Sequence, residues 1–151
     1  MPPGTPMFTG DRISLLTDTT CLKYNDDEII ELHNDDLLDW KNATNHQYWL
    51  DIRGLHDAAY MERIGNKFEI HPLALEDVVD VDQRPKMDEY DNAIFVTILA
   101  LKINNLNGEL IKEQVTLYFG QKFLISFQED ADDFLAPIRE RMYHKRGRIR
   151  P

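Results

Sequence analysis

Four strand-like segments follow one another in the second half of the chain, and this run limits the fold more than any other feature. Apolar residues recur in them, and short turns separate them at residues 105–108 and at Gly120. The segments are residues 86–90, 93–103, 110–119 and 121–127. Consecutive strands joined by short turns pair in an antiparallel manner. We therefore expect a meander of antiparallel strands.

Ahead of this meander, strand-like and helix-like patterns alternate. Tyr48, Leu50 and Ile52 recur at every second residue and predict a strand. Asp57 is placed to cap a helix, and Pro72 suits the first position of the next one. The expected strands are residues 12–16, 19–24 and 48–53. The expected helices are residues 34–41, residues 57–68, and a helix that starts at residues 71–72 and is ended by Arg84-Pro85. This order predicts an α/β (α+β) fold in which helices cover a mixed sheet.

The length of 151 residues suits one compact domain. Residues 1–10 contain three prolines and two glycines, and we interpret them as a flexible leader. We place the domain at residues 11–136 and a final helix at residues 137–151, which begins with its proline. In that helix Ile138 and Met142 are expected to face inward.

Charge is divided unevenly along the chain. There are 17 basic and 27 acidic residues, which gives a net charge of −10. Residues 139–151 hold six basic residues and one acidic residue, so they carry +5 and the rest carries −15. Such an acidic body repels phosphate backbones and anionic lipids, which argues against nucleic acid and membrane surfaces as partners. It favours cations or basic partners, and the basic end suits the first turns of a longer helix.

Several catalytic classes lack their motifs in this sequence. The seven glycines are scattered singly, so there is no glycine-rich loop for nucleotide phosphates. The five histidines form no metal-binding pair, and a lone cysteine, Cys21, cannot hold a structural zinc. Ser14 and Ser126 lie in expected strands, outside any nucleophile elbow. No signal-peptide pattern is present, and the longest apolar run, residues 93–101, is too short to cross a bilayer, so we expect a soluble chain.

One expected helix combines an apolar face with a cluster of carboxylates. A helical wheel places Leu75, Val78 and Val79 on one side, and Glu76, Asp77 and Asp80 on the other. The carboxylates lie near the C-terminal end of the helix, where anions oppose the helix dipole, so a bound cation would stabilise them. One or two carboxylates completed by water suit Mg²⁺. The alternative is that they form only the polar face of an amphipathic helix.

Six motifs occur in a fixed order over about two thirds of the chain. They are residues 49–56 (WLDIRGLH), 70–78 (IHPLALEDV), 83–86 (QRPK), 113–115 (EQV), 127–129 (FQE) and 137–141 (PIRER). In this combination they resemble the cytoplasmic N-terminal domain of the CorA family of magnesium and cobalt channels. The resemblance implies helices packed on both faces of the sheet (α/β/α), followed in the family by a stalk helix and two membrane helices. Neither a membrane helix nor the family's Gly-Met-Asn pore motif occurs in this sequence.

The resemblance also implies a regulatory metal site. Family members form pentamers that bind Mg²⁺ between the N-terminal domain of one subunit and the stalk of its neighbour. The acidic pair after the His-Pro-Leu motif supplies the ligands of the N-terminal domain, which here are Asp77 and Glu76. Asp80 is expected to contribute only to the local field.

These observations lead to one hypothesis and two alternatives. We expect the regulatory cytoplasmic domain of a homo-oligomeric divalent-cation channel for Mg²⁺ and Co²⁺, at the cytoplasmic face of the cell membrane and without catalytic residues. In it, Mg²⁺ at intersubunit sites would control gating. One alternative is the zinc-transporter branch of the same family. The other is a soluble metal-dependent enzyme that uses the acidic cluster to activate water.

Overall fold

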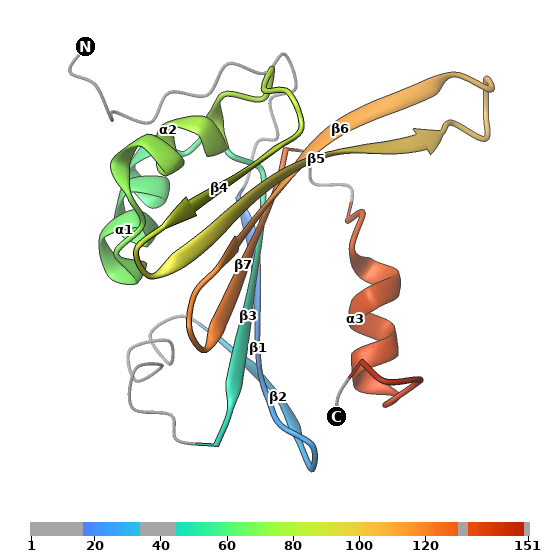
Figure 1. Ribbon diagram of the computed structural model, residues 1–151. Helices are drawn as coiled ribbons and strands as arrows, with labels where there is room; N and C mark the ends of the chain where they lie inside the picture. Colours follow the sequence, from blue (N-terminus) through green and yellow to red (C-terminus); the bar gives the residue numbers. More distant parts are fainter. Residues whose placement is uncertain (1–16, 34–44, 130–132, 150–151) are drawn as a thin grey trace.

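The computed structural model describes residues 17–33, 45–129 and 133–149. In this part of the chain, seven strands form one sheet in the order β2-β1-β3-β7-β6-β5-β4. The strands are β1 (Asp18–Tyr24), β2 (Ile29–Leu32), β3 (Gln47–Arg53), β4 (Lys86–Tyr90), β5 (Ala93–Ile103), β6 (Leu110–Phe119) and β7 (Phe123–Gln128). The helices are α1 (Ala58–Phe68), α2 (Pro72–Val79) and α3 (Ala136–Tyr143). Figure 1 shows α1 and α2 on one face of the sheet and α3 on the other, as the sequence predicted.

The sheet is mixed because β3 and β7 run parallel, whereas the other described neighbours pair in an antiparallel manner. The expected meander is present as the continuous run from β4 to β7. Strand β3, formed much earlier in the sequence, joins the end of this meander with Leu50 opposite Ile125. This pairing places β3 inside the sheet, where both of its faces can be covered.

The main core lies between the sheet and the α1–α2 pair. Its fully buried side chains include Ile52, Met61, Val78 and Phe95. Both helices begin at side-chain caps, since Asp57 Oδ1 accepts a hydrogen bond from the Tyr60 amide at 2.9 Å and His71 Nδ1 accepts one from the Leu73 amide at 3.2 Å. These caps satisfy amides that the first helical turn leaves without partners.

On the opposite face α3 packs over β1 and β3 through a smaller cluster, whose buried members are Leu22, Trp49 and Met142. Met142 faces inward as expected, but the expectation for Ile138 was wrong, because its side chain is 41% exposed. Arg139 is buried in its place. Arg139 and Met142 are three residues apart and share one helix face, whereas Ile138 is turned about 100° away from Arg139.

Helix α3 is shorter than expected and begins one residue earlier, at Ala136, so its proline occupies the second position. It ends at Tyr143 instead of continuing to residue 151. Lys145 and Gly147 have φ angles of 49° and 73°, and this left-handed backbone cannot continue an α-helix.

Strand β2 was not predicted, because its four residues after the acidic turn carry too short a pattern. The expected strand at residues 12–16, the expected helix at residues 34–41 and the leader at residues 1–10 lie outside the described residues. Within the described ranges, none of the helices has the length and apolar composition needed to span a bilayer.

The environment of Cys21 predicts an unreactive thiol. Its side chain is 2% exposed, and burial raises the pKa of the thiol to about 12. At pH 8 only about one molecule in ten thousand would carry the reactive thiolate, compared with roughly a quarter for a free cysteine. We expect alkylation by iodoacetamide at pH 8, followed by mass spectrometry, to be at least about 100-fold slower in the folded protein than in urea. Similar rates in both conditions would contradict this burial.

Candidate divalent-cation site

Helix α2 presents its carboxylates as the helical wheel predicted. Leu75, Val78 and Val79 are buried against the sheet, while Glu76 and Asp77 lie on the outer side and are half-buried. The last turn of α2 carries no basic residue, so compensation for the carboxylates at this helix end has to come from another element.

That compensation comes from β4, the strand that follows. Lys86 Nζ lies 2.5 Å from Asp77 Oδ2 and 3.3 Å from Asp88 Oδ2. The same ammonium lies 5.8 Å from the centre of the Phe95 ring. The hydrogen bond to Asp77 raises the pKa of Lys86, although partial burial acts in the opposite direction. Asp77 is therefore a carboxylate that already holds a cation, and its side chain is 26% exposed.

The third carboxylate of the predicted cluster, Asp80, is used for local structure. It is the C-terminal cap residue of α2, and its Oδ2 accepts a hydrogen bond from Gln83 Nε2 at 2.5 Å. Its backbone oxygen accepts a hydrogen bond from Gln114 Nε2 at 3.2 Å. Asp80 thus holds the connection between α2 and β4.

The carboxylate oxygens at this end of α2 are of the ligand type found in magnesium sites. Mg²⁺ binds oxygen ligands and commonly uses one or two carboxylates with several waters. Asp77 and Glu76 supply oxygens of this type, but the described residues contain no group of three or more His, Cys, Asp or Glu side chains placed to hold a metal. The described residues therefore do not form a complete metal site by themselves.

A second polar cluster, which sequence reasoning missed, lies buried between α3 and the sheet. Asp51 is 1% exposed, and its Oδ1 accepts hydrogen bonds from Ser126 Oγ at 2.5 Å and from Gln128 Nε2 at 2.9 Å. Its Oδ2 accepts one from Arg139 Nη2 at 2.6 Å. Asp133 accepts hydrogen bonds from Arg139 and from Arg53, the latter at 2.7 Å. We call these residues the α3 clasp: Asp51, Arg53, Ser126, Gln128, Asp133 and Arg139.

The side chains of β3 point alternately to the two faces of the sheet, and this pattern in the sequence indicates part of the α3 clasp. Trp49, Asp51 and Arg53 occupy the second face of the strand, which a single amphipathic pattern assigns to solvent. That face is buried because α3 covers it, and the parallel pairing of β3 with β7 sets Asp51 opposite Ser126. Neither contact can be inferred from the spacing of residues within β3.

The two acids of the α3 clasp respond differently to their surroundings. Burial raises the pKa of Asp51, although hydrogen bonds from Ser126 and Gln128 and the nearby arginines oppose this shift. Burial also acts to raise the pKa of Asp133, but hydrogen bonds from Arg139 and Gln128 outweigh it and lower that pKa. The two carboxylates thus have the hydrogen-bond partners that buried acids need, which suits them to fixing α3 on the sheet.

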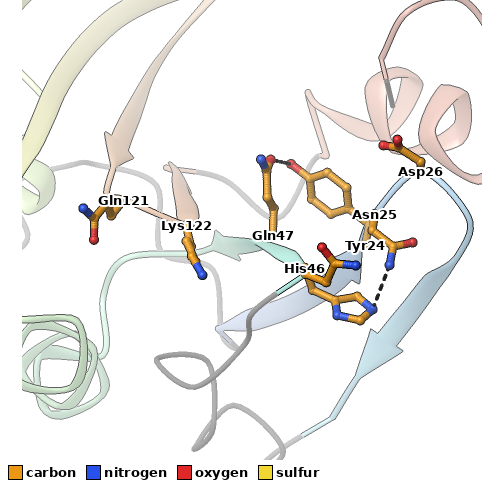
Figure 2. Close-up of a pocket in the computed structure, with 8 residues that line it drawn as sticks. Tyr24, Asn25, Asp26, His46, Gln47, Gln121 and Lys122 are labelled. Atoms are coloured by element: carbon orange, nitrogen blue, oxygen red, sulfur yellow. Dashed lines mark hydrogen bonds between the residues drawn. The ribbon is translucent and has the colours of Figure 1, made fainter.

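A hollow of about 340 Å³ lies where β1 ends and β3 begins, beside the turn between β6 and β7. Figure 2 shows its labelled lining residues, which include His46, Gln47 and Lys122. His46 Nε2 lies 2.8 Å from Glu28 Oε1 and 3.2 Å from Asn25 Nδ2. None of the lining residues belongs to α2 or β4, so this hollow is separate from the Asp77 site.

Comparison with known sequences identifies the family. The sequence model described as "CorA-like Mg2+ transporter protein" matches residues 44–151. The chain belongs to the CorA family. A relative named cobalt/magnesium transport protein CorA, from Thermotoga maritima, is 33% identical over 153 residues, which cover 99% of this chain and 43% of the relative. The chain therefore spans less than half the length of this CorA relative. The family consists of transporters, which removes the alternative of a soluble enzyme.

Solved structures share the CorA-type fold. The soluble domain of CorA from Methanocaldococcus jannaschii superposes with a TM-score of 0.61 at 13% identity, over 83% of this chain and 47% of that one. The cytoplasmic domain of ZntB from Vibrio parahaemolyticus gives a TM-score of 0.60 at 13% identity, over 85% of this chain and 51% of that one. At this level of identity the likeness establishes the fold.

The α3 clasp predicts a large effect of a small substitution. Asp51→Asn keeps the size of the side chain but leaves Arg139 buried beside an uncharged amide. Breaking a buried ion pair by removing one partner costs about 3–5 kcal/mol, so we expect a loss of about 3 kcal/mol in the free energy of unfolding, measured by urea denaturation.

The matched control for this substitution is Asp27→Asn, which makes the same chemical change at an exposed position in the β1–β2 turn. It should change the free energy of unfolding by no more than about 0.5 kcal/mol. A loss below about 1 kcal/mol for Asp51→Asn would show that the α3 clasp does not hold α3 to the sheet.

Proposed function

We propose that this chain is the regulatory cytoplasmic domain of a CorA-type divalent-cation transporter, and that it senses Mg²⁺ through Asp77 with Glu76 beside it. The contact between Lys86 and Asp77 carries this proposal, because it marks Asp77 as a partly exposed carboxylate that already binds a positive charge. Glu76 is its sequence neighbour on the outer side of α2 and is also half-buried. Two adjacent carboxylates and water are a coordination set that Mg²⁺ accepts.

The missing half of the site would come from a neighbouring subunit. In this proposal the full-length protein is a homo-oligomer, a pentamer as the family resemblance implies, and a stalk helix of the neighbour faces Asp77. A cation shared between the two would hold the subunits together, and its loss would leave the carboxylates to repel one another. Gating is then a shift of population that depends on how differently the closed and open assemblies bind the ion.

The proposed cargo is Mg²⁺ with Co²⁺ as a second substrate, after the family description and the name of the Thermotoga maritima relative. The zinc-transporter branch is the second candidate, and the similarity to the cytoplasmic domain of ZntB favours keeping it. Carboxylate ligands at a regulatory site do not distinguish these ions as cargo. Ion flux through the full-length protein separates the two candidates.

The proposed location is the cytoplasmic face of the cell membrane. The chain carries a net charge of −10, and an acidic body raises the local concentration of divalent cations near its surface. A sensor of abundant cytosolic Mg²⁺ has to bind the ion weakly. The negative field of the protein would favour ion binding at such a weak site.

Calorimetric titration with MgCl₂ tests the role of Asp77. We expect this chain to bind Mg²⁺ weakly, in the millimolar range, because it supplies only part of the ligands. Asp77→Asn removes one charge at the site and should weaken binding about ten-fold, since the Coulomb energy lost is of the order of 1–2 kcal/mol.

Asp27→Asn is the matched control for this titration, because it removes an equal charge at an exposed turn. It should leave the binding constant nearly unchanged. Micromolar binding that Asp77→Asn does not affect would refute the assignment of Asp77 as the metal ligand.

A further inference from the structure

We propose that Lys86 is an internal counter-cation that competes with Mg²⁺ for the carboxylate of Asp77 and thereby sets the concentration at which the site fills. This inference rests on the proposed function, because it takes Asp77 as the cation ligand. It assigns a regulatory role to a residue of β4 that lies outside the predicted ligand pair.

The first observation is that the ammonium group already occupies the carboxylate. Lys86 Nζ lies 2.5 Å from Asp77 Oδ2, which is within the range of a strong charge-assisted hydrogen bond. Both side chains are only partly exposed, 32% for Lys86 and 26% for Asp77. Asp77 can therefore coordinate a metal through this oxygen only after it exchanges the ammonium for the ion.

The second observation is that Lys86 has another acceptor within reach. Asp88 Oδ2 lies 3.3 Å from Nζ, and the two residues are separated by one position on β4, so their side chains project from the same face of the strand. The Phe95 ring lies 5.8 Å from Nζ and belongs to the residue paired with Asp88 across the sheet. When Lys86 leaves Asp77, its ammonium still contacts the carboxylate of Asp88 and the ring of Phe95, so no positive charge is left without a partner.

The third observation concerns the helix end itself. The last turn of α2 has no basic residue of its own, and its carboxylates oppose the helix dipole. Lys86 supplies the missing positive charge from β4, which keeps α2 stable when the site holds no ion. A monovalent cation would bring no more charge than Lys86 already supplies, whereas a divalent ion brings twice as much, so the competition favours divalent ions.

The size of the effect follows from the strength of the ion pair. An ion pair between partly exposed side chains stabilises the paired state by about 0.2–1 kcal/mol. The apparent affinity for Mg²⁺ is the intrinsic affinity multiplied by the fraction of molecules in which Asp77 is not paired with Lys86. Removing the ammonium should therefore tighten Mg²⁺ binding roughly two- to six-fold.

The test uses NMR titrations of this chain with MgCl₂ at constant ionic strength, read from the amide shifts of α2. Lys86→Met removes the charge and keeps a long apolar side chain, and Lys86→Gln repeats the test should the methionine disturb the fold. Lys86→Arg keeps the charge. Lys112→Met is the matched control, because it removes one positive charge from an exposed position on β6 of the same sheet.

We expect Lys86→Met to bind Mg²⁺ roughly two- to six-fold more tightly than the unchanged chain, and Lys86→Arg and Lys112→Met to bind no more tightly. The gain must disappear when Asp77→Asn is added, which shows that Lys86 acts through Asp77. A purely structural role for Lys86 would move the stability of the fold but not produce this gain.

Failure of the two proposals gives different results. If Asp77→Asn weakens binding but Lys86→Met does not strengthen it, or Lys112→Met strengthens it equally, the role of Lys86 is refuted while the proposed function stands. If Asp77→Asn leaves Mg²⁺ binding unchanged, the proposed function fails and the inference about Lys86 fails with it.

Discussion

The parallel pairing of β3 with β7 shapes both faces of the sheet. It inserts β3 between β1 and the end of the meander, so every residue of β3 after the first is buried. One face of β3 then packs into the main core under α1 and α2, and the other carries Asp51 into the α3 clasp. A strand buried on both faces can carry a carboxylate only if that group is fully hydrogen-bonded, and Ser126, Gln128 and Arg139 meet this need.

The two faces of the sheet stabilise their helices by different means. On the α1–α2 side a large apolar core forms most of the packing, and the end of α2 contacts the first residue of β4 through Asp77 and Lys86. On the α3 side a small apolar cluster is supplemented by buried ion pairs, which are directional and hold one orientation of the helix. In the proposed transporter, α2 would carry the sensing carboxylates, and the proposed stalk would follow α3.

The carboxylate of Asp77 lies near the C-terminal end of α2 and is compensated by Lys86 from β4. A carboxylate that opposes the helix dipole is unfavourable by itself, and a fully buried ion pair would be too stable to exchange. Asp77 lies between these extremes, since its partner Lys86 is partly exposed and comes from a different element. Both partners are partly exposed, so solvent and ions can reach the pair.

The sequence predicts the local elements, because their signals lie within a few residues: the cap at Asp57, the proline that opens α2, and the period-two pattern of residues 48–52. It also determined the acidic face of α2 and, through six ordered motifs, the family. The tertiary structure sets what each face of an element touches. It buried Asp51 and Arg139, turned Ile138 outward, and brought Lys86 to Asp77, because these contacts depend on which strands become neighbours and not on spacing along the chain.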